Sequence, residues 1–461
     1  MSAIREYLQG LQGKRVAVIG IGVSNTPLIR LLLNAGVSVT ACDKRNREQF
    51  DGPAEELERL GAVLKLGEDY LEGLDHDVIF RTPGLRPDVP QLLQARERGS
   101  EITSEMEVFF KVCPCRMIAI TGSDGKTTTT TLISEMLKAA GYTVHVGGNI
   151  GKPLLPEVED IKADDIAVLE LSSFQLLTMQ QSPNIAVVTN LAPNHLDMHR
   201  GMEEYIAAKE NIYLHQTAAD RLVLNADNEI TASFIPKAKG TVALFSRTKA
   251  PRRGVWLRED NVICARNDAG EREVMSAGDI LLPGIHNVEN YMTAIAAVDG
   301  LVSDEVMRQV ATTFGGVEHR IELVRTLDGV RYYNDSIGTS PSRTKSGLRS
   351  FDQKVILIAG GYDKKIPFDE LGGEIVDHVK HLILTGATAE KIRTAVEQAP
   401  RYEIGKPPIT MIDDFKDAVC YARKIARDGD VVILSPACAA FDRFRNFMER
   451  GKFFKQIVNE F

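Results

Sequence analysis

A glycine-rich stretch between an apolar run and a helix constrains this chain most. The run Arg116 to Ile120 leads into Thr121-Gly122-Ser123-Asp124-Gly125-Lys126-Thr127-Thr128, and residues 132–140 follow at helical spacing. This order predicts a strand, a loop and a helix, with backbone N–H groups and a helix N-terminus facing one point. Phosphate oxygens suit that point, while a lysine and a hydroxyl supply a cation and an Mg²⁺ ligand. We therefore expect bound ATP or GTP.

The loop departs from the usual G-x-x-x-x-G-K-[ST] pattern, because Ile120 stands where the first glycine is expected. We predict a loop one turn tighter than a standard phosphate loop. The alternative is a chance glycine-rich turn before a helix. The strand, both glycines, the lysine and the hydroxyl occur together, and this favours the phosphate site.

Length and charge exclude several classes of protein. A chain of 461 residues has room for about three domains, each with its own core. Lysine and arginine number 55 against 63 acids, and the net charge of −8 gives no sign of nucleic-acid or membrane-surface binding. The six cysteines show no paired zinc spacing, and no apolar run is long enough to span a membrane. We expect a soluble cytoplasmic protein.

A second glycine turn lies near the start of the chain. An apolar run ends at Gly20 and Gly22, and the next run ends at Asp43, which predicts half of a nucleotide-binding βαβ unit. Asn25 stands where a dinucleotide fingerprint has its third glycine, although Asp43 lies at a suitable distance for a ribose contact. The turn either holds a second nucleotide or serves helix–sheet packing alone. We expect the loop Thr82-Pro83-Gly84 on the same ligand side.

Glu170 ends another apolar run, Asp165 to Leu169, that we predict to be a buried parallel strand. The carboxyl ends of parallel strands share one edge of the sheet, so this carboxylate lies beside the phosphate loop, where it can hold Mg²⁺. The alternative is an ordinary solvated strand end.

The next predicted strand, Asn184 to Thr189, runs into His195, Asp197 and His199. These residues are open to interpretation as a transition-metal cluster, but the nearby phosphate loop favours a site for Mg²⁺ and phosphate.

Lys209 lies on the apolar stripe of a helix that we predict from Tyr205 to Tyr213. A lysine in that position pairs with a carboxylate, extends its ammonium to solvent, or becomes a neutral reactive amine. The residues alone favour extension to solvent.

Short alternating strands from about residue 241 to 275 predict a small antiparallel flap. A long helix then begins near Asn287 and Asn290, which stand one turn apart and can face one ligand. Residues 314–320 have the composition of a linker. Beyond them a third doubly wound sheet is predicted from further apolar runs: Val330 to Tyr333, Val355 to Ala359, Leu382 to Leu384, Ile409 to Ile412 and Val431 to Leu434.

The expected fold is therefore α/β with three domains. They are a Rossmann-like domain (1–112), a central P-loop domain with a parallel sheet and the flap (113–315), and a C-terminal Rossmann-like domain (316–461). Domain closure around two anionic ligands excludes water, which suits a ligase better than a hydrolase. An NAD-dependent oxidoreductase and a nucleotide-dependent binding switch are the alternatives from other classes.

Motifs along the whole chain resemble the Mur ligase family. They are Gly122 to Thr128, Glu170 to Leu176, Asn194 to Asp197, Lys209, His319-Arg320, Asn334 to Ser336 and Leu434 to Ala439. The resemblance implies an ADP-forming ligase of peptidoglycan precursor synthesis, with UDP-N-acetylmuramoyl-L-alanine and D-glutamate as substrates. The alanyl carboxylate attacks the γ-phosphate of ATP, and the glutamate amine then displaces phosphate. A folylpolyglutamate synthase-like sibling is the alternative with the same chemistry.

The resemblance also implies roles for individual residues. The catalytic residues would be Lys126, Glu170, His195 and Lys209. ATP would be held by Gly122, Ser123, Asp124, Gly125, Lys126, Thr127, Thr128, Asn287, Asn290, Arg320 and Asp335. Two Mg²⁺ ions would be held by Thr127, Glu170, His195 and Lys209, the last of which matches a family lysine that carries a carbamate.

Substrate residues follow from the same resemblance, and we separately expect a monomer. The UDP-sugar would be held by Val23, Ser24, Asp43, Lys44, Arg45, Gly84, Asn149, Ser172 and His195, and D-glutamate by Thr339, Lys364, Ala440, Phe441 and Phe447. Ile337 stands where many members of the family have lysine. Ala440 stands where some members have serine. The adjacent Lys365 leaves open which lysine points inward.

Overall fold

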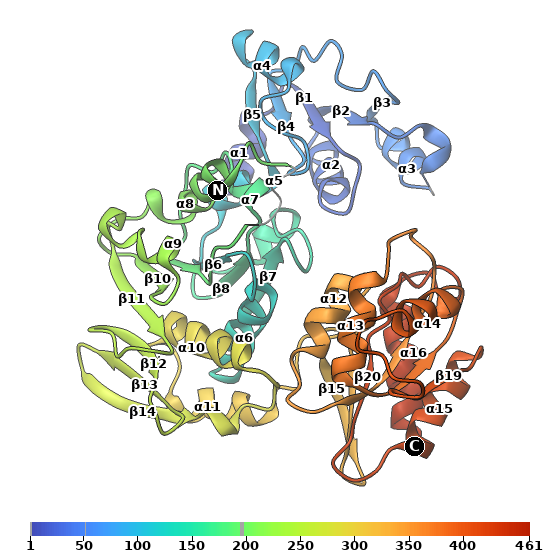
Figure 1. Cartoon of the computed structure of the whole chain (residues 1–461). Helices are drawn as coiled ribbons and strands as arrows, with labels where there is room; N and C mark the ends of the chain where they lie inside the picture. Colours follow the sequence, from blue (N-terminus) through green and yellow to red (C-terminus); the bar gives the residue numbers. More distant parts are fainter. Residues whose placement is uncertain (1, 51, 194–197) are drawn as a thin grey trace. The chain divides into compact units, whose positions relative to one another are not determined.

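Three β-sheets organise residues 2–50, 52–193 and 198–461, which the computed structural model describes (Figure 1). The chain divides into two compact units, Met1–Ala277 with Glu289–Val310, and Gly278–Val288 with Ala311–Phe461. The first unit contains two of the sheets and the second contains the third. Within the described residues, no helix has the length and apolar character needed to cross a membrane.

The first sheet is parallel throughout and has the strand order β3-β2-β1-β4-β5, coloured blue in Figure 1. Its strands are β1 (Arg15–Ile19), β2 (Ser38–Asp43), β3 (Val63–Leu66), β4 (Val78–Phe80) and β5 (Glu101–Thr103). Its helices are α1 (Ala3–Gly10), α2 (Asn25–Asn34), α3 (Pro53–Arg59), α4 (Pro90–Glu97) and α5 (Glu105–Val112). Val16 and Val18 pack into one core and Ala17 and Ile19 into another, so both faces of β1 are covered. The expected Rossmann-like arrangement is confirmed.

The second sheet has the order β14-β13-β12-β11-β10-β9-β6-β8-β7. Its strands are β6 (Arg116–Thr121), β7 (Val144–Gly148), β8 (Ile166–Glu170), β9 (Ile185–Val188), β10 (Arg221–Asn225), β11 (Thr241–Ser246), β12 (Gly254–Leu257), β13 (Val262–Asn267) and β14 (Gly270–Ser276). The helices are α6 (Lys126–Ala139), α7 (Ser173–Leu176), α8 (Met202–Leu214), α9 (Glu229–Ala232), α10 (Ile285–Val298) and α11 (Asp304–Thr313). The last two have residues in both compact units.

Strand β6 marks the switch point of this sheet. The chain leaves β6 through α6 toward β7 and β8 on one side and later reaches β9 on the other side. Loops at the ends of β6, β8 and β9 therefore meet at one edge, which is where ligands bind in open α/β sheets.

The antiparallel flap is smaller than expected. Strand β11 pairs parallel with β10, and β12 pairs parallel with β11, so residues 241–257 extend the parallel sheet. Antiparallel pairing begins between β12 and β13 and continues between β13 and β14. Alternation of apolar and polar residues is typical of a half-covered strand of either direction, so it did not reveal the direction of β11.

The third sheet has the order β15-β16-β20-β17-β18-β19, in which β15 alone runs antiparallel to its neighbour among the described strands. The strands are β15 (Glu322–Leu327), β16 (Val330–Asn334), β17 (Val355–Ala359), β18 (Val379–Leu384), β19 (Ile409–Met411) and β20 (Val431–Leu434). The helices are α12 (Pro341–Leu348), α13 (Asp369–His378), α14 (Ala389–Glu397), α15 (Phe415–Ile425) and α16 (Phe447–Asn459).

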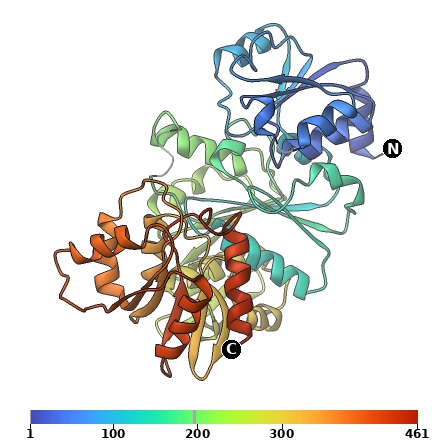
Figure 2. The same ribbon diagram turned by 90° about the vertical axis from the view of Figure 1, so that its right-hand side faces the viewer.

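Helices cover both faces of this sheet, as Figure 2 shows. Helices α12, α13 and α14 pack into one core with Leu357 and Ile433, while α15 and α16 pack into the other with Ile356 and Val432. Neighbouring residues of one strand face opposite cores, which explains the continuous apolar runs of β17 and β20. The predicted third doubly wound sheet is confirmed, whereas the domain boundaries after residues 112 and 315 stay predictions.

Candidate active site

Two glycines of the nucleotide loop are required by backbone shape and by close neighbours. Gly122 (φ +149°) and Gly125 (φ +77°) have backbone conformations that residues with side chains rarely adopt. A Cβ at Gly122 would lie 1.9 Å from Thr189 Oγ1, and one at Gly125 would lie 2.4 Å from Asn290 Oδ1. Gly125 also precedes α6, whose first N–H groups have no carbonyl partner within the helix. The loop therefore presents N–H groups and the positive end of a helix to an anion.

The other loop residues are fixed by neighbouring elements. Ser123 Oγ lies 2.9 Å from Tyr205 OH, and the N–H of Asp124 donates to Asn190 Oδ1 at 3.0 Å. Thr128 is buried in the first turn of α6. The loop is thus held by the end of β9 and by α8 as well as by its own strand.

Lys126 folds back over the loop that precedes it. Its Nζ donates to Gly122 O and to Ser123 O, both at 2.9 Å. This arrangement keeps a cation at the loop, where the phosphates of a bound nucleotide are expected.

Glu170 lies beside this loop, as expected from the end of β8. The residue pairs with Ile120 of β6 and is 2% exposed. Its Oε2 accepts a 2.7 Å hydrogen bond from Thr127 Oγ1, and its Oε1 accepts one of 2.8 Å from Asn149 Nδ2. The alternative of a solvated strand end is wrong. A carboxylate and a hydroxyl are the oxygen ligands that Mg²⁺ prefers, so Glu170 and Thr127 fit that ion.

Lys209 does not extend to solvent, so that interpretation of its position is wrong. The residue is 2% exposed, and its Nζ donates to Thr121 Oγ1 at 3.0 Å and to Gly122 O at 2.9 Å. Burial, together with the nearby charge of Lys126, holds the pKa of Lys209 well below its usual value. The side chain bends toward the nucleotide loop because hydrogen-bond acceptors lie there.

Asn290 also reaches the nucleotide loop, where its Oδ1 accepts from Thr129 Oγ1 at 3.4 Å. Asn287 belongs to the second compact unit, where its Nδ2 donates to Pro283 O at 2.7 Å. Arg320 lies in the second unit too. The expectation that these side chains hold one ATP across a domain junction therefore stays a prediction.

His195 and Asp197 lie outside the described residues, whereas His199 is described and buried. His199 Nε2 lies 2.8 Å from Ser173 Oγ, and Nδ1 lies 3.3 Å from Glu204 Oε2. Both ring nitrogens of His199 thus have protein partners. Among the described residues, no group of three His, Cys, Asp or Glu side chains is arranged to hold a metal ion.

Two predicted substrate residues flank the strand-end carboxylate. The backbone N–H of Asn149 donates to Glu170 O at 2.7 Å, and its side chain reaches Glu170 Oε1. Ser172 forms a capping box with Gln175 at the start of α7. Asn149 therefore contacts the Glu170 carboxylate, and Ser172 follows Glu170 by two residues in the sequence.

The glycine turn after β1 is ordered by Asp43. One oxygen of the buried Asp43 carboxylate accepts from the N–H of Ile21 at 2.7 Å, and the other accepts from the N–H of Arg45 at 2.9 Å. The Arg45 guanidinium pairs with the same carboxylate and lies 4.2 Å from the centre of the Phe50 ring. Burial opposes ionisation, but the hydrogen bonds from Arg45 and Ile21 keep the pKa of Asp43 below its usual value. Asp43 thus shapes the turn and positions Arg45.

The surface around this turn is open and polar at its edge. Val23 is 83% exposed, and Ser24, Lys44 and Gly84 are exposed as well. A Cβ at Gly20 would lie 3.1 Å from Thr82 Cβ, so the loop that includes Gly84 lies beside the turn, as predicted.

Asn25 distinguishes this turn from a dinucleotide site. The side chain is 3% exposed, and its Nδ2 donates to Ile19 O at 2.9 Å. A buried amide therefore occupies the position where the dinucleotide fingerprint has its third glycine, a residue that permits close helix–strand packing. This contact weakens the oxidoreductase alternative.

In the second unit, the predicted glutamate-binding residues lie on the loops after β16, β17 and β20 and at the start of α16. Lys364 Nζ donates to Thr339 O at 3.3 Å, so Lys364 rather than Lys365 meets the predicted partner. Ala440 is buried, whereas Phe441 is 62% exposed. The loop after β17 therefore offers the ammonium of Lys364, and the loop after β20 offers the exposed ring of Phe441.

Further aromatic contacts extend this region of the second unit. The Phe441 ring lies 5.8 Å from that of Tyr362, and the half-buried Phe447 ring lies 6.0 Å from that of His319. Phe447 begins α16 and therefore approaches from a different element.

Asp335 is buried in the same unit. Its Oδ2 accepts a 2.7 Å hydrogen bond from Ser435 Oγ. Burial raises the pKa of Asp335 to about 7, although the hydrogen bonds from Ser435 and Ile321 and the charge of Arg320 act in the opposite direction.

Arg450 is a residue that the sequence reasoning missed. The buried guanidinium donates to Ser336 Oγ and O at 2.9 Å, to Ala439 O at 3.1 Å and to Cys438 O at 3.0 Å. It therefore joins the loop after β16 to the loop after β20. Arg450 lies on the stripe of Phe454 and Ile457, a placement that also singled out Lys209.

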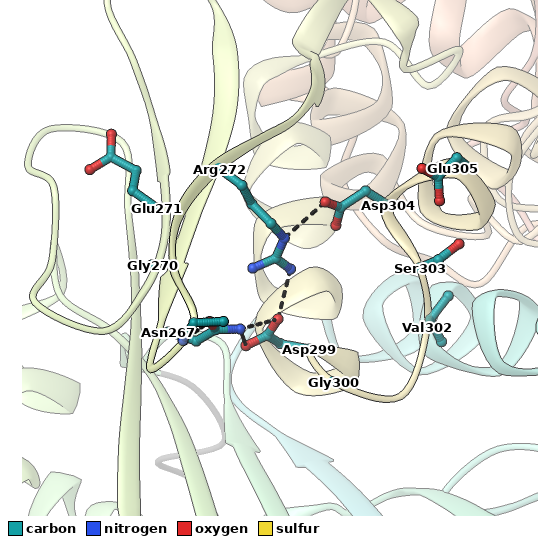
Figure 3. Close-up of a pocket in the computed structure, with 11 residues that line it drawn as sticks. Asn267, Gly270, Glu271, Arg272, Asp299, Gly300, Val302, Ser303, Asp304 and Glu305 are labelled. Carbon is teal, nitrogen blue, oxygen red and sulfur yellow. Dashed lines mark hydrogen bonds and ion pairs between the residues drawn. The ribbon is translucent and has the colours of Figure 1, made fainter.

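A separate pocket of about 400 Å³ lies where β13 and β14 meet the end of α10 and the start of α11 (Figure 3). The Arg272 guanidinium crosses it and donates to Asp299 at 2.7 Å and to Asp304 at 2.8 Å. Asn267 also donates to Asp299, at 3.0 Å. The pocket shares no residue with the nucleotide loop.

The middle and C-terminal parts of the chain match two family descriptions. Residues 120–298 match the Mur ligase middle domain, and residues 319–438 match the Mur ligase glutamate ligase domain. An enzyme of Acetivibrio thermocellus named UDP-N-acetylmuramoylalanine--D-glutamate ligase is 53% identical over 459 residues, covering 99% of this chain and 98% of that one. An enzyme of the same name from Clostridium novyi is 50% identical over 455 residues, covering 98% of both.

Solved structures have the same fold at low identity. UDP-N-acetylmuramate-alanine ligase from Thermotoga maritima matches with a TM-score of 0.57 at 18% identity, over 97% of this chain and 99% of that one. The loop, the strand-end carboxylate and this fold define an α/β nucleotide-type site, and the two relatives of 50% identity or more are ligases by name. The chain belongs to the Mur ligase family.

Proposed function

We propose that the chain joins D-glutamate to UDP-N-acetylmuramoyl-L-alanine at the expense of ATP, as a step of peptidoglycan precursor synthesis. Two relatives with about half of their residues identical over nearly the whole chain carry the name of that ligase. The single structural observation that carries the proposal is the contact between Thr127 and Glu170 at the nucleotide loop. It brings together, at a loop suited to phosphate, the carboxylate and hydroxyl oxygens that Mg²⁺ prefers as ligands.

The reaction has two bond exchanges. An oxygen of the alanyl carboxylate attacks the γ-phosphorus of ATP, the bond from that phosphorus to the β-bridging oxygen breaks, and ADP leaves. The amine of D-glutamate then attacks the acyl carbon, inorganic phosphate leaves, and the amine loses a proton. Lys126 and the loop N–H groups stabilise negative charge on the phosphoryl oxygens. Preorganised donors of this kind lower the barrier without reorganising during the reaction.

The residues at the loop fit a divalent cation. Glu170 and Thr127 would hold Mg²⁺, and the ion, when bound, supplies charge stabilisation and orients the phosphates. We extend the proposal to two ions, with His195 and Lys209 as further ligands. For Lys209 this requires a carbamate.

The carbamate of Lys209 is supported by the burial of its amine. Burial lowers the pKa of Lys209 and so favours the neutral amine, which adds CO₂ to give a carbamate anion and a proton. The anion would place an oxygen ligand at Gly122. Carbon-13 NMR in labelled bicarbonate tests this step, because Lys209→Met should remove a carbamate signal that the wild type has.

We assign the UDP-sugar to the turn after β1. Arg45 is held by Asp43 and Phe50, which leaves a fixed cation beside the open surface of Val23 and Ser24. A guanidinium suits a diphosphate. Asn149, Ser172 and His195 would contact the muramoyl-alanyl end next to Glu170.

For D-glutamate we propose Thr339, Lys364, Ala440, Phe441 and Phe447. The Lys364 ammonium is suited to the side-chain carboxylate of the amino acid, and the Phe441 ring to its methylene groups. We also propose a cytoplasmic location, because all six cysteines are free, as expected in a reducing compartment, and we propose that the chain is a monomer. Light scattering on the purified chain tests the oligomeric state.

The test of the function measures phosphate release by the full chain with ATP, Mg²⁺ and UDP-N-acetylmuramoyl-L-alanine. D-Glutamate, L-glutamate, L-lysine and diaminopimelate serve as competing acceptors. We expect release that depends on the UDP-sugar and on D-glutamate. Equal release with another acceptor, or release without the UDP-sugar, would contradict the proposal.

A further inference from the structure

Helix α8 contributes two side chains to the nucleotide site. The position and rotation of the helix relative to the loop therefore decide whether these side chains reach it. Tyr205 OH lies 2.9 Å from Ser123 Oγ, and Lys209 Nζ lies 2.9 Å from Gly122 O. A shift of one residue along a helix rotates each side chain by about 100°. The helix follows Gly201, whose φ of +119° is rarely adopted by residues with a side chain, and no side-chain cap fixes where α8 begins. Contacts outside the helix must therefore fix its register.

Arg86 anchors the first turn of α8 to the first sheet. This arginine lies in the loop between β4 and α4, two residues after Gly84. Its guanidinium forms two hydrogen bonds with the Glu204 carboxylate, at 2.8 and 2.9 Å, and a third with Met198 O at 2.7 Å. A paired guanidinium and carboxylate fixes direction as well as distance, because both groups are planar.

His199 joins the same carboxylate to helix α7. The imidazole is fully buried and stacks on the Phe174 ring at 5.1 Å with 5° between the planes. Because the Glu204 carboxylate can only accept, we assign the ring proton to Nδ1, and Ser173 then donates to Nε2. Ser173 follows Glu170 by three residues. His199 thus links the helix after the strand-end carboxylate to the helix of Lys209.

We propose that Arg86, Glu204 and His199 act as one set of positioning residues for the ligase reaction. They hold α8 in the register that places Tyr205 at Ser123 and Lys209 at Gly122. They also connect the loop between β4 and α4, which includes Gly84, with the nucleotide site. None of the three touches the reacting atoms in this arrangement. The inference rests on the proposed function and assigns residues that the family motifs of this chain do not include.

A purely structural role makes a different kinetic prediction. If the three residues only stabilise the fold, their variants unfold more easily but keep the turnover number and Michaelis constants of the folded protein. If they position α8, the folded variants bind D-glutamate normally and turn over slowly.

His199→Phe is the main test because it keeps the ring between Phe174 and Tyr205 and removes both nitrogens. We expect kcat to fall roughly tenfold to a hundredfold, as for misplaced catalytic groups, with the KM for D-glutamate within about twofold. His199→Gln retains an acceptor for Ser173 and should recover part of the loss. An unchanged kcat in His199→Phe would overturn the proposal.

A double-mutant cycle tests whether the residues act as one unit. Glu204→Gln and His199→Phe should each lower kcat, and the double variant should be about as slow as the slower single variant. If the fold-decrease in kcat of the double variant equalled the product of the two single decreases, the residues would act independently, and the shared positioning role would be overturned. Arg30→Met is the matched control, because Arg30 and Glu56 form a similar bidentate pair within the first sheet's helices. The control should keep kcat.

Calorimetric binding of a non-hydrolysable ATP analogue separates this inference from the proposed function. We expect His199→Phe to bind the analogue several-fold more weakly than Arg30→Met. If the wild type released no phosphate with D-glutamate, the function would fail, yet this difference would still support the positioning role. If His199→Phe and Arg30→Met bound the analogue equally well and His199→Phe kept a normal kcat, the positioning role would be contradicted, while the proposed function would stand.

Discussion

The hydroxyl of Thr127 donates a 2.7 Å hydrogen bond to Oε2 of Glu170, which ties the first turn of α6 to the end of β8. The two residues are far apart in the sequence and meet because β6 and β8 are parallel neighbours. The contact places a carboxylate and a hydroxyl beside the glycine-rich loop.

Lys126→Ala should lower substrate-dependent phosphate release at least about a hundredfold, by analogy with removing one preorganised donor at an oxyanion site. Its ammonium donates hydrogen bonds to the loop carbonyls of Gly122 and Ser123 and therefore lies at the loop. Single-turnover assays at saturating ATP measure the loss of the chemical step. Lys138→Ala, which removes an exposed lysine from the end of the same helix, is the control and should leave the rate unchanged.

Gly122→Ala should abolish nucleotide binding while the rest of the chain stays folded. The added Cβ would lie 1.9 Å from Thr189 Oγ1, so the loop has to move away from β9. Calorimetry with an ATP analogue checks the effect. Gly10→Ala is the matched control, since a Cβ at that position meets nothing within 4 Å. Normal affinity in Gly122→Ala would show that the loop shape is not needed for binding.

Ionisation of Glu105 should lower the free energy of unfolding of the first unit as the pH rises. Burial raises its pKa to about 7, although its Oε1 accepts from the N–H of Leu155 at 2.9 Å. Between about pH 4.5 and 7 the folded chain binds more protons at this group than the unfolded chain, so the free energy of unfolding falls with increasing pH. The wild type should lose up to about 3 kcal/mol relative to Glu105→Gln across this range.

Urea unfolding of the wild type and Glu105→Gln at several pH values measures this difference. The glutamine keeps the acceptor for Leu155 and cannot ionise. A difference between the two proteins that does not change with pH would contradict the assignment of Glu105 as the titrating group.

Arg450→Met should destabilise the second unit by roughly 3 kcal/mol, because several buried acceptors lose their charged donor. It should also raise the KM for D-glutamate, since Arg450 joins the loops after β16 and β20. Thermal unfolding and steady-state kinetics give the two quantities. Arg349→Met, which removes an exposed guanidinium from its pair with the partly buried Glu374, is the control and should change neither quantity by much.

The fold and the arrangement of the glycine-rich loop beside Glu170 were predictable from the sequence because the relevant signals are local. Apolar runs such as Val355–Ala359 are buried on both faces, and the loop from Gly122 to Thr127 lies between a strand and a helix. The position of Glu170 followed from one rule about the ends of parallel strands. Each of these inferences needs only neighbouring residues and a common topology.

The contacts that join distant segments were not predictable. Lys209 was expected to reach solvent, since sequence periodicity gives the face of a helix but not the acceptors opposite to it. The direction of β11 depended on its partner, and the contact of Arg86 with Glu204 spans more than a hundred residues. Such pairs are fixed by tertiary packing, which no local pattern contains.

The folded-back side chain of Lys126 has a consequence for ligand choice. An anion that draws this ammonium to itself must replace two hydrogen bonds to backbone carbonyls. A single inorganic phosphate offers little beyond that exchange, whereas a chain of three phosphates can also occupy the N–H groups of the loop. The loop should therefore discriminate by ligand length, and common small anions of the cell should compete poorly for it.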